Sequence, residues 1–274
     1  MMKEIPKVIH YCWFGRGNKN DLMNKCINSW KEKLSDYKIK EWNEDNFDIN
    51  INDYVKEAYE SKKYAFVTDY VRLYVLYNYG GIYMDTDVEV LKNLDEFLVH
   101  EAFSGFENNN QIPTGIIGAK KGNRWIKMLL EEYNDLHFIK KDGSFDLTTN
   151  VVRITNSTEK EYGLIKNNTY QDLKDVVFYS HDYFCPKDWE TGNIYITDNT
   201  HTIHHFNGSW HSSKEKKQIK KREKYIEKYG KEIGFKKYDK YLKMQRFINI
   251  FLIPFKVIIN PKKAYRRLKY TVKK

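Results

Sequence analysis

Two aspartates one residue apart, Asp85 and Asp87, are the residues of this chain best suited by type and spacing to hold a cation. They follow the apolar run 82–84, which the glycine pair Gly80-Gly81 precedes. In an extended segment, side chains at i and i+2 point to the same side, so both carboxylates can converge on one ion. Oxygen ligands suit Mg²⁺ or Mn²⁺, ions that commonly accompany phosphate groups. The pair therefore predicts a protein that handles an activated, phosphate-linked substrate.

Two other interpretations of the aspartate pair are a solvated turn and a calcium loop. Asp85, Asp87, Glu89 and Glu96 do fall at positions 1, 3, 5 and 12 of an EF-hand. Position 6, however, is Val90, where the EF-hand needs a glycine for its sharp turn. The apolar run before Asp85 is also typical of a strand rather than a helix. These departures exclude the EF-hand and leave the solvated turn as the alternative to a cation site.

A second charged pair, Asp69 and Arg72, lies three residues apart on the helix that the sequence predicts upstream of the aspartates. The spacing places both side chains on one face of that helix. They could form a surface ion pair that contributes less than about 1 kcal/mol to stability. They could instead present a carboxylate to ribose hydroxyls and a guanidinium to phosphate, whose oxygens match the forked geometry of arginine.

Three segments together resemble glycosyltransferase family 32, a group of DXD-motif sugar-nucleotide transferases that includes capsular-polysaccharide enzymes and fungal α-1,6-mannosyltransferases. The core of the resemblance runs from Thr68-Asp69-Tyr70-Val71-Arg72 to the segment Gly80–Asp87. The opening segment Ile5–Gly15 is similar to the family's first strand, and His204–Trp210 resembles its C-terminal closing motif. The resemblance is dense over residues 5–120, thin over 121–200, and returns at 203–210. It implies a GT-A-like α/β domain that binds a nucleotide-sugar, with a mostly parallel central sheet.

The resemblance also implies which residues bind the donor, most simply a UDP-hexose. Trp13 would stack on the base, and Asp69 would bind the ribose or the sugar. Arg72 would contact the donor's phosphate or the sugar hydroxyls. Ser209 and Trp210 would touch the β-phosphate as a C-terminal loop closes over the donor.

For the metal, Mn²⁺ or Mg²⁺, the resemblance implies that Asp87 is a direct ligand and that Asp85 contacts the ribose and a metal-bound water. His205 matches a metal-binding histidine of related retaining transferases, and His204 remains open as the alternative. Because successive residues of a strand face opposite sides, only one of the two adjacent histidines is expected to be a ligand.

The implied reaction is retaining transfer of a hexose to a glycan or lipid-linked acceptor in surface or capsular polysaccharide synthesis. With Asp85 and Asp87, Arg72 completes the catalytic set expected to stabilise the departing nucleotide diphosphate. The sequence names no nucleophile. Thr114, Asp146 and Asp182 are only candidates for residues near the acceptor.

Hydrophobic periodicity, turn residues and β-branched residues supply the elements that would position these groups. The expected strands lie at 7–13, 37–42, 82–84, 88–90, 102–106, 115–119, 176–179 and 202–206, and the expected helices at 21–34, 64–79 and 124–133. Strands alternating with helices favour an α/β fold with a largely parallel sheet.

Charge divides the chain into two expected domains, a catalytic domain at 1–213 and a basic amphipathic helical tail at 214–274. The tail contains 22 Lys or Arg and 5 Asp or Glu, a net charge of +17, whereas residues 1–213 carry a net charge of −7. Residues 214–229 are typical of a basic helix, and 247–259 form an apolar run flanked by cations. Such a tail fits an anionic membrane surface, packing onto the acidic body, or nucleic acid.

Nucleic-acid binding through the tail is the alternative function, distinguished by strong salt dependence. Because the body is acidic and contains no groove-reading motif, we expect no nucleic-acid partner. The odd number of dispersed cysteines argues for a reducing compartment. The N-terminus lacks the apolar region of a signal peptide, and no apolar run is long enough to span a membrane. The expected location is therefore cytoplasmic, with peripheral attachment at the inner face of the membrane.

Overall fold

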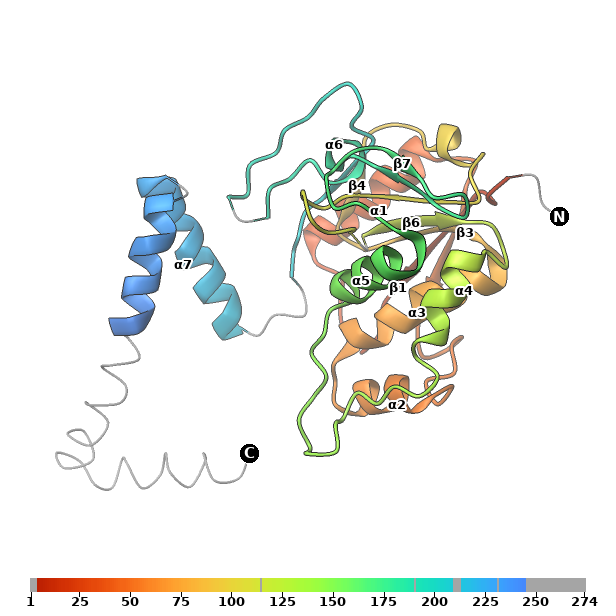
Figure 1. The fold of residues 1–274 in the computed structure, drawn as a ribbon, viewed down its shortest axis with the longest axis horizontal. Coiled ribbons are helices and arrows are strands. Elements are labelled where there is room, and N and C mark those ends of the chain that lie inside the picture. The colour runs from red at the N-terminus through yellow and green to blue at the C-terminus, as the bar shows by residue number, and fades with distance from the viewer. Residues whose placement is uncertain (1–3, 114, 190, 209–212, 231, 245–274) are drawn as a thin grey trace. The chain divides into compact units, whose positions relative to one another are not determined.

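The computed structural model describes residues 4–113, 115–189, 191–208, 213–230 and 232–244. The chain divides into two compact units, residues 1–210 and residues 211–274. The first unit is an α/β domain, and the described part of the second consists of helices (Figure 1). Within the described residues, no helix is both long and apolar enough to cross a bilayer.

A seven-stranded sheet with the order β2-β1-β3-β6-β5-β8-β7 forms the centre of the first unit. Its strands are β1 (Val8–Cys12), β2 (Lys38–Trp42), β3 (Gly81–Met84), β5 (Ala102–Gly105), β6 (Ile116–Ala119), β7 (Gln171–Asp172) and β8 (Val177–Tyr179). Five of them run in one direction, and only β6 and β7 run the opposite way. A separate two-stranded sheet pairs β4 (Val88–Val90) with β9 (Thr202–His204). The expectation of an α/β fold with a largely parallel sheet is confirmed.

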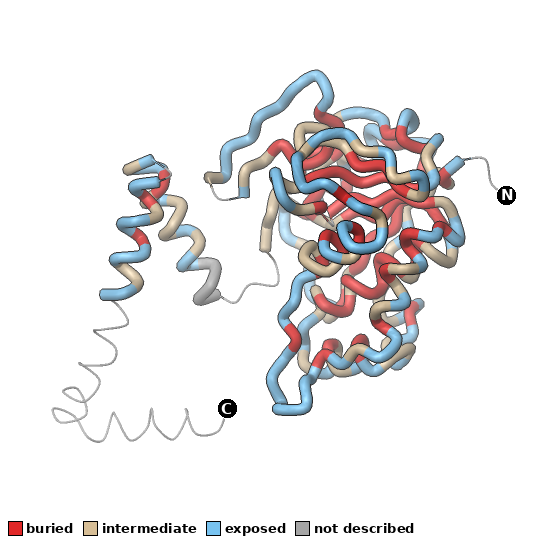
Figure 2. Tube along the Cα trace, in the orientation of Figure 1, coloured by how far each residue is buried: buried red, intermediate tan, exposed pale blue. Residues whose placement is uncertain are grey.

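Both faces of the central sheet are buried (Figure 2). Alternation along β3 sends Ile82 and Met84 into one core and Tyr83 into the other. The core around Tyr83 is shared with α2 (Asp53–Glu60), α3 (Tyr64–Tyr79), α4 (Arg124–Glu131) and α5 (Asn150–Tyr162). The core around Ile82 is shared with α1 (Asp21–Lys33), β4, the 3₁₀ turn η1 (Asp95–Phe97) and α6 (His181–Phe184).

The glycine pair makes the sharp connection between α3 and β3 possible. Gly80 is the C-cap of α3, where its N–H donates to Leu76 O, and both glycines have positive φ, +68° and +116°. A Cβ on Gly81 would lie 2.6 Å from Val8 O, and a Cβ on Gly80 would lie 2.7 Å from Lys121 N. Glycine is therefore required at both positions, by conformation and by space. The short connection fixes how the end of β3, and thus Asp85, follows the helix that carries Asp69 and Arg72.

The elements expected around the aspartates are all present, with ends that shift by one or a few residues. The elements that the sequence reasoning missed are α2, α5, α6, β7 and η1. Most are short, and α5 is polar along most of its length, so neither pattern nor length identified them.

The described part of the second unit contains α7 (Ser213–Tyr229) and a helical segment at 232–244. Tyr238 and Ile226 are buried within this unit, and Tyr238 OH donates to Gln218 O at 3.0 Å. Lys221 Nζ lies 3.5 Å from the centre of the Tyr241 ring. The expected basic helix is therefore present, whereas the apolar run at 247–259 lies outside the described residues.

Candidate active site

Asp85 and Asp87 occupy a turn that carries the chain from β3 in the central sheet to β4 in the small sheet. The turn is held by two backbone hydrogen bonds, from Asp85 N to Gly115 O at 2.9 Å and from Val88 N to Asp85 O at 3.0 Å. Both aspartates point toward the same histidine ring, so the expected convergence of the carboxylates is present. It arises from a turn rather than from the extended geometry that the sequence suggested.

His204, not His205, is the histidine that the structure brings to the two carboxylates. Its Nε2 lies 3.4 Å from Asp87 Oδ1 and 4.0 Å from Asp85 Oδ2. The pairing of β4 with β9 places His204 directly opposite Val88, next to Asp87. His205 points elsewhere, because its Nε2–H donates to Glu89 Oε2 at 2.7 Å. The side chain of His205, expected in the aspartate cluster, therefore lies outside it, and only its backbone N–H contacts Asp87, donating to Asp87 O at 3.0 Å.

Asp87 and His204 perturb each other strongly. Burial raises the pKa of Asp87, but the positive field of His204 and the N–H of Asn207 more than offset this and lower it below its usual value. Burial lowers the pKa of His204, and the charge of Asp87 overcomes that effect and raises it well above 6.5. Without a cation, the protonated ring supplies the positive charge that the carboxylates require. The pair is therefore poised for a cation to replace a proton.

The side chains of Asp85, Asp87 and His204 fit a divalent cation. One ligand atom from each lies within 4.8 Å of the others, and this is the only group of three or more His, Cys, Asp or Glu side chains so arranged among the described residues. Two carboxylate oxygens and one imidazole nitrogen form a donor set compatible with Mn²⁺ or Mg²⁺. Asn207 N–H donates to Asp87 Oδ2 at 2.7 Å, which leaves Oδ1 directed toward His204.

Arg72 lies behind the aspartates as a buried cation, only 4% exposed. Its guanidinium contacts Asp85 Oδ1 at 3.4 Å and donates to Asp69 Oδ1 at 3.2 Å. Its carbon Cζ lies 4.6 Å from the centre of the Tyr83 ring, and Tyr83 OH donates to Asp85 Oδ1 at 2.8 Å. The interpretation of Asp69 and Arg72 as a solvated surface pair is therefore excluded, because both side chains are enclosed by the core around α3.

Asp69 has an unusual protonation equilibrium for a carboxylate. Burial raises its pKa to about 7, although the neighbouring Arg72 opposes the increase. Its backbone O accepts a hydrogen bond from Asn150 Nδ2 at 3.3 Å. The two aspartates of this network, Asp69 and Asp85, thus share Arg72 as their counter-charge.

Trp13 directly follows β1, at the same carboxyl edge of the sheet as Asp85, because β1 and β3 are parallel neighbours. The indole is half-buried, and its Nε1–H donates to Gly17 O at 2.6 Å. Lys19 Nζ lies 5.2 Å from the ring centre. The structure therefore brings Trp13 to the edge of the sheet where the aspartates lie, as a base platform requires.

Other sequence candidates fall outside this cluster or outside the described residues. Ser209, Trp210 and Thr114 are not among the described residues. Asp146 forms an ion pair with Arg153, and the carboxylate of Asp182 accepts hydrogen bonds from three neighbouring side chains.

Sequence reasoning assigned no role to Asn207, and it did not identify Glu107. Burial raises the pKa of Glu107, which lies close enough to His204 and Asp85 to feel both charges. Neither residue is part of the aspartate motif, and Glu107 comes from the loop after β5. Asn207 lies in the segment His204–Trp210 that the resemblance singled out, but its contact with Asp87 depends on the β4–β9 pairing, and no local pattern indicated Glu107.

Comparisons with known proteins find relatives of the region that contains the aspartate turn. Residues 20–104 match the family described as "Glycosyltransferase sugar-binding region containing DXD motif". Inositol phosphoceramide mannosyltransferase 3 of Schizosaccharomyces pombe is 30% identical over 129 residues, which are 44% of this chain and 35% of that protein. Inositol phosphoceramide mannosyltransferase 1 of the same organism is 30% identical over 112 residues, 37% of this chain and 34% of that protein. The chain thus spans about a third of the length of these curated relatives.

Solved structures that resemble the chain include "PaToxG Glycosyltransferase", with a TM-score of 0.44 and 17% identity over 59% of this chain and 71% of that chain. A glycosyltransferase involved in the glycosylation of the major capsid of PBCV-1 has a TM-score of 0.36 and 12% identity over 65% of this chain and 83% of that chain. Because these TM-scores are below 0.5, the α/β fold is assigned from the order and directions of the strands alone. The segment that contains Asp85 and Asp87 is therefore similar to the DXD-containing sugar-binding region of that family.

Proposed function

We propose that this chain is a metal-dependent, retaining glycosyltransferase that moves a hexose from a nucleotide-sugar to a glycan or lipid-linked acceptor. The single observation that carries the proposal is the convergence of His204 on Asp85 and Asp87, two residues that lie in a region matching a DXD glycosyltransferase family. In a solvated turn the Asp87 side chain would be exposed, whereas here it is buried against a histidine from a strand more than 100 residues away in the chain.

The cation, Mn²⁺ or Mg²⁺, would be held by Asp85, Asp87 and His204, and would stabilise the diphosphate as a leaving group. The protein's own contribution is to fix the two carboxylates before the substrate arrives. Asp87 is fixed by Asn207 N–H, and Asp85 by Tyr83 OH and Arg72. Such fixed groups need no reorganisation during the reaction, which is the main source of electrostatic catalysis.

The donor would lie along the carboxyl edge of the sheet. Trp13 would stack on the base, and Asp69 would contact the ribose or the sugar hydroxyls. Arg72 would orient Asp85 and extend its positive field toward the donor phosphate or sugar. Ser209 and Trp210 would close over the β-phosphate.

The donor would be a nucleotide-linked hexose, and a UDP-hexose is our first candidate. Both curated relatives are named as mannosyltransferases, so a mannosyl donor is the second candidate. We propose surface or capsular polysaccharide synthesis as the setting and the cytoplasmic face of a membrane as the location. The three buried, unpaired cysteines suit a reducing compartment.

The test of the proposed activity is hydrolysis of a panel of UDP- and GDP-hexoses by the full chain, with and without added Mn²⁺. We expect one donor to be cleaved in the presence of Mn²⁺, cleavage to stop when a chelator is added, and excess Mn²⁺ to restore it. Equal cleavage before and after chelation would contradict the metal-dependent mechanism, and cleavage of no donor would contradict the activity itself.

We further propose that the second unit attaches the enzyme to an anionic membrane surface. Four exposed lysines of α7 support this proposal: Lys217, Lys220, Lys224 and Lys228. A basic residue near an anionic surface contributes about 1 kcal/mol to binding. Replacing all four by Gln in the full chain should therefore abolish co-sedimentation with phosphatidylserine-containing vesicles, while donor hydrolysis continues. Undiminished sedimentation of this variant would contradict attachment through α7.

A further inference from the structure

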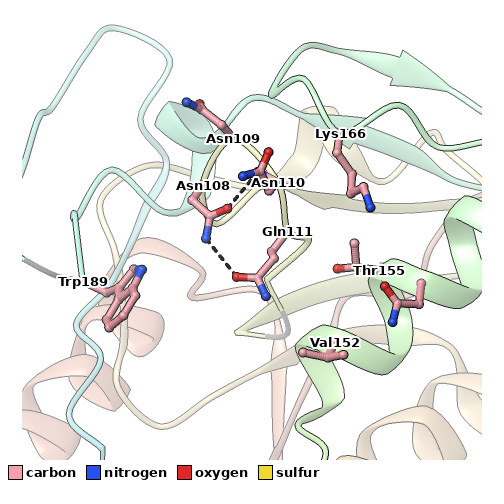
Figure 3. Close-up of a pocket in the computed structure, with 9 residues that line it drawn as sticks. Asn108, Asn109, Asn110, Gln111, Val152, Thr155, Lys166 and Trp189 are labelled. Atoms are coloured by element: carbon pink, nitrogen blue, oxygen red, sulfur yellow. Dashed lines mark hydrogen bonds between the residues drawn. The ribbon is translucent and has the colours of Figure 1, made fainter.

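A hollow of about 760 Å³ lies in the first unit, beside the loop that joins β5 to β6 (Figure 3). This volume falls within the roughly 300–1,000 Å³ typical of small-molecule sites. The residues of the loop that line it are Asn108, Asn109, Asn110 and Gln111. Helix α5 and Trp189 provide further parts of the wall, and in Figure 3 the loop amides lie between Trp189 and Thr155. None of the site residues discussed so far lines this hollow.

The chemistry of the wall selects a class of ligand. Five carboxamide side chains line it: Asn108, Asn109, Asn110, Gln111 and Asn156. A carboxamide both donates and accepts hydrogen bonds, which matches the hydroxyl groups of a sugar. Trp189 is 42% exposed and offers a flat apolar surface, as the carbon-bound hydrogens on one face of a pyranose ring require.

Charged ligands fit the wall poorly. Among the described residues that line it, none is an aspartate or a glutamate, so the wall offers a metal ion no carboxylate. Its one cation, Lys166, forms an ion pair with Glu159 Oε2 at 2.7 Å. A phosphate or diphosphate would need several cations or helix-terminal N–H groups instead. The wall therefore favours an uncharged, hydroxyl-rich molecule.

The loop is already ordered by hydrogen bonds of its own. Asn108 Nδ2 donates to Gln111 Oε1 at 3.1 Å, and Glu107 N donates to Gln111 O at 2.8 Å. Ile112 N donates to Thr155 Oγ1 at 3.0 Å, which ties the loop to α5 through a buried hydroxyl. A wall formed before the ligand arrives avoids part of the entropy cost of binding.

One end of this loop contacts the aspartate cluster, and the other end interacts with it electrostatically. At one end, Gly115 O accepts the hydrogen bond from Asp85 N, and a Cβ on Gly115 would lie 2.8 Å from His204 Nδ1. At the other end, Glu107 interacts electrostatically with Asp85 and His204. Asn108, which lines the hollow, directly follows Glu107 in the chain, so the same loop carries both the wall of the hollow and a charge that acts on the cluster.

We propose that this hollow binds the acceptor of the transferase reaction, and that the acceptor presents an uncharged sugar ring to it. The inference rests on the proposed function. An acceptor hydroxyl oxygen forms a bond to the anomeric carbon of the donor, while the bond from that carbon to the diphosphate oxygen breaks. The bonding electron pair leaves with the diphosphate, which also takes up the hydroxyl proton. The carboxamides and Trp189 hold the ring so that this hydroxyl faces the aspartate cluster.

The test uses the full chain, Mn²⁺ and the donor that it hydrolyses, with the methyl glycosides of glucose, galactose, mannose and N-acetylglucosamine as acceptors. Two rates are measured together: transfer to the glycoside and transfer to water. We expect Trp189→Ala and Asn156→Ala to lower the ratio of transfer to hydrolysis by about tenfold or more, mainly through a higher KM for the glycoside. Trp189→Phe should restore most of the ratio, because it keeps an aromatic face.

The matched control is Asn134→Ala, which removes another exposed carboxamide outside the hollow and should leave both rates unchanged. Saturation-transfer NMR on the wild-type chain gives a second readout, in which the glycoside signal should disappear in Trp189→Ala. If the wild type hydrolyses a donor but neither binds nor modifies a glycoside, the sugar assignment is wrong while the proposed function stands. The same conclusion follows if both hollow variants keep the wild-type ratio. If no donor is hydrolysed, the proposed function fails, and the inference fails with it.

Discussion

The two adjacent histidines allow a sharp test of the site, because the structure assigns them different partners. His204 Nε2 lies 3.4 Å from Asp87 Oδ1, whereas His205 Nε2 donates to Glu89. The two substitutions, His204→Ala and His205→Ala, remove the same atoms one residue apart in the chain. Any difference between them must therefore come from what each imidazole contacts.

The expected magnitudes follow from these contacts. Loss of a residue that merely supports a metal ligand weakens metal binding by about 10–100-fold, so loss of the ligand itself should cost about 100-fold or more. That factor corresponds to about 2.7 kcal/mol or more of binding free energy. His205→Ala removes one half-buried hydrogen bond to Glu89, which should cost about 1 kcal/mol of folding stability. Mn²⁺ affinity should then change by less than about threefold, because the backbone N–H of residue 205 still holds Asp87.

The assay is calorimetric titration of Mn²⁺ into metal-free wild type and both variants, with urea unfolding of each protein as the control for stability. His204→Ala should show the large loss of affinity, and His205→Ala should bind Mn²⁺ almost as the wild type does. If His205→Ala weakens binding as much as His204→Ala, or more, the assignment of His204 to the cluster is refuted.

Three further predictions concern the framework of the site. Burial lowers the pKa of His10 from its usual 6.5 to about 4, so between these pH values the unfolded chain binds a proton that the folded chain does not. The neutral ring therefore contributes about 3 kcal/mol to the free energy of unfolding above pH 6.5, and this contribution should be lost as the pH falls toward 4. Urea unfolding against pH should show this loss as the part of the wild-type pH dependence that His10→Gln lacks. Thr158→Val should destabilise the protein by about 1–3 kcal/mol in thermal unfolding, because it leaves the buried Nε1–H of Trp125 without its hydrogen-bond acceptor. Thr158→Ser keeps the hydroxyl and should cost much less. Gly115→Ala should weaken Mn²⁺ binding by about tenfold, since its Cβ would lie 2.8 Å from His204 Nδ1; unaltered affinity would show that the ring can move without consequence.

The sequence predicted the parts of the fold that have a local signature. The apolar run before Asp85, the glycine pair and the periodic helix at 64–79 each correspond to an observed element, because burial on a strand or helix imposes a period on the sequence. The polar helix α5 has no such stripe and was missed, although it supports one wall of the hollow.

The composition of the site could be predicted only in part, for the same reason. Asp85 and Asp87 are neighbours in sequence, and their spacing alone suggested a cation. The choice between His204 and His205 depends on the register of β9 against β4, which is a long-range pairing with no local signal. The burial of Arg72 could not be predicted either, because a helix with charged residues in one row usually exposes that row to solvent.

The most direct test of the central claim is donor hydrolysis by Asp87→Asn in the presence of Mn²⁺. Asparagine keeps an oxygen that can accept the hydrogen bond from Asn207 N, so the fold should survive while the charge that the cation needs is lost. The matched control, Asp135→Asn, changes an exposed aspartate that follows α4. We predict that Asp87→Asn retains a cooperative thermal transition but that its rate of donor hydrolysis falls by about 100-fold or more. Asp135→Asn should hydrolyse the donor at the wild-type rate. Hydrolysis by Asp87→Asn at the wild-type rate would contradict the account.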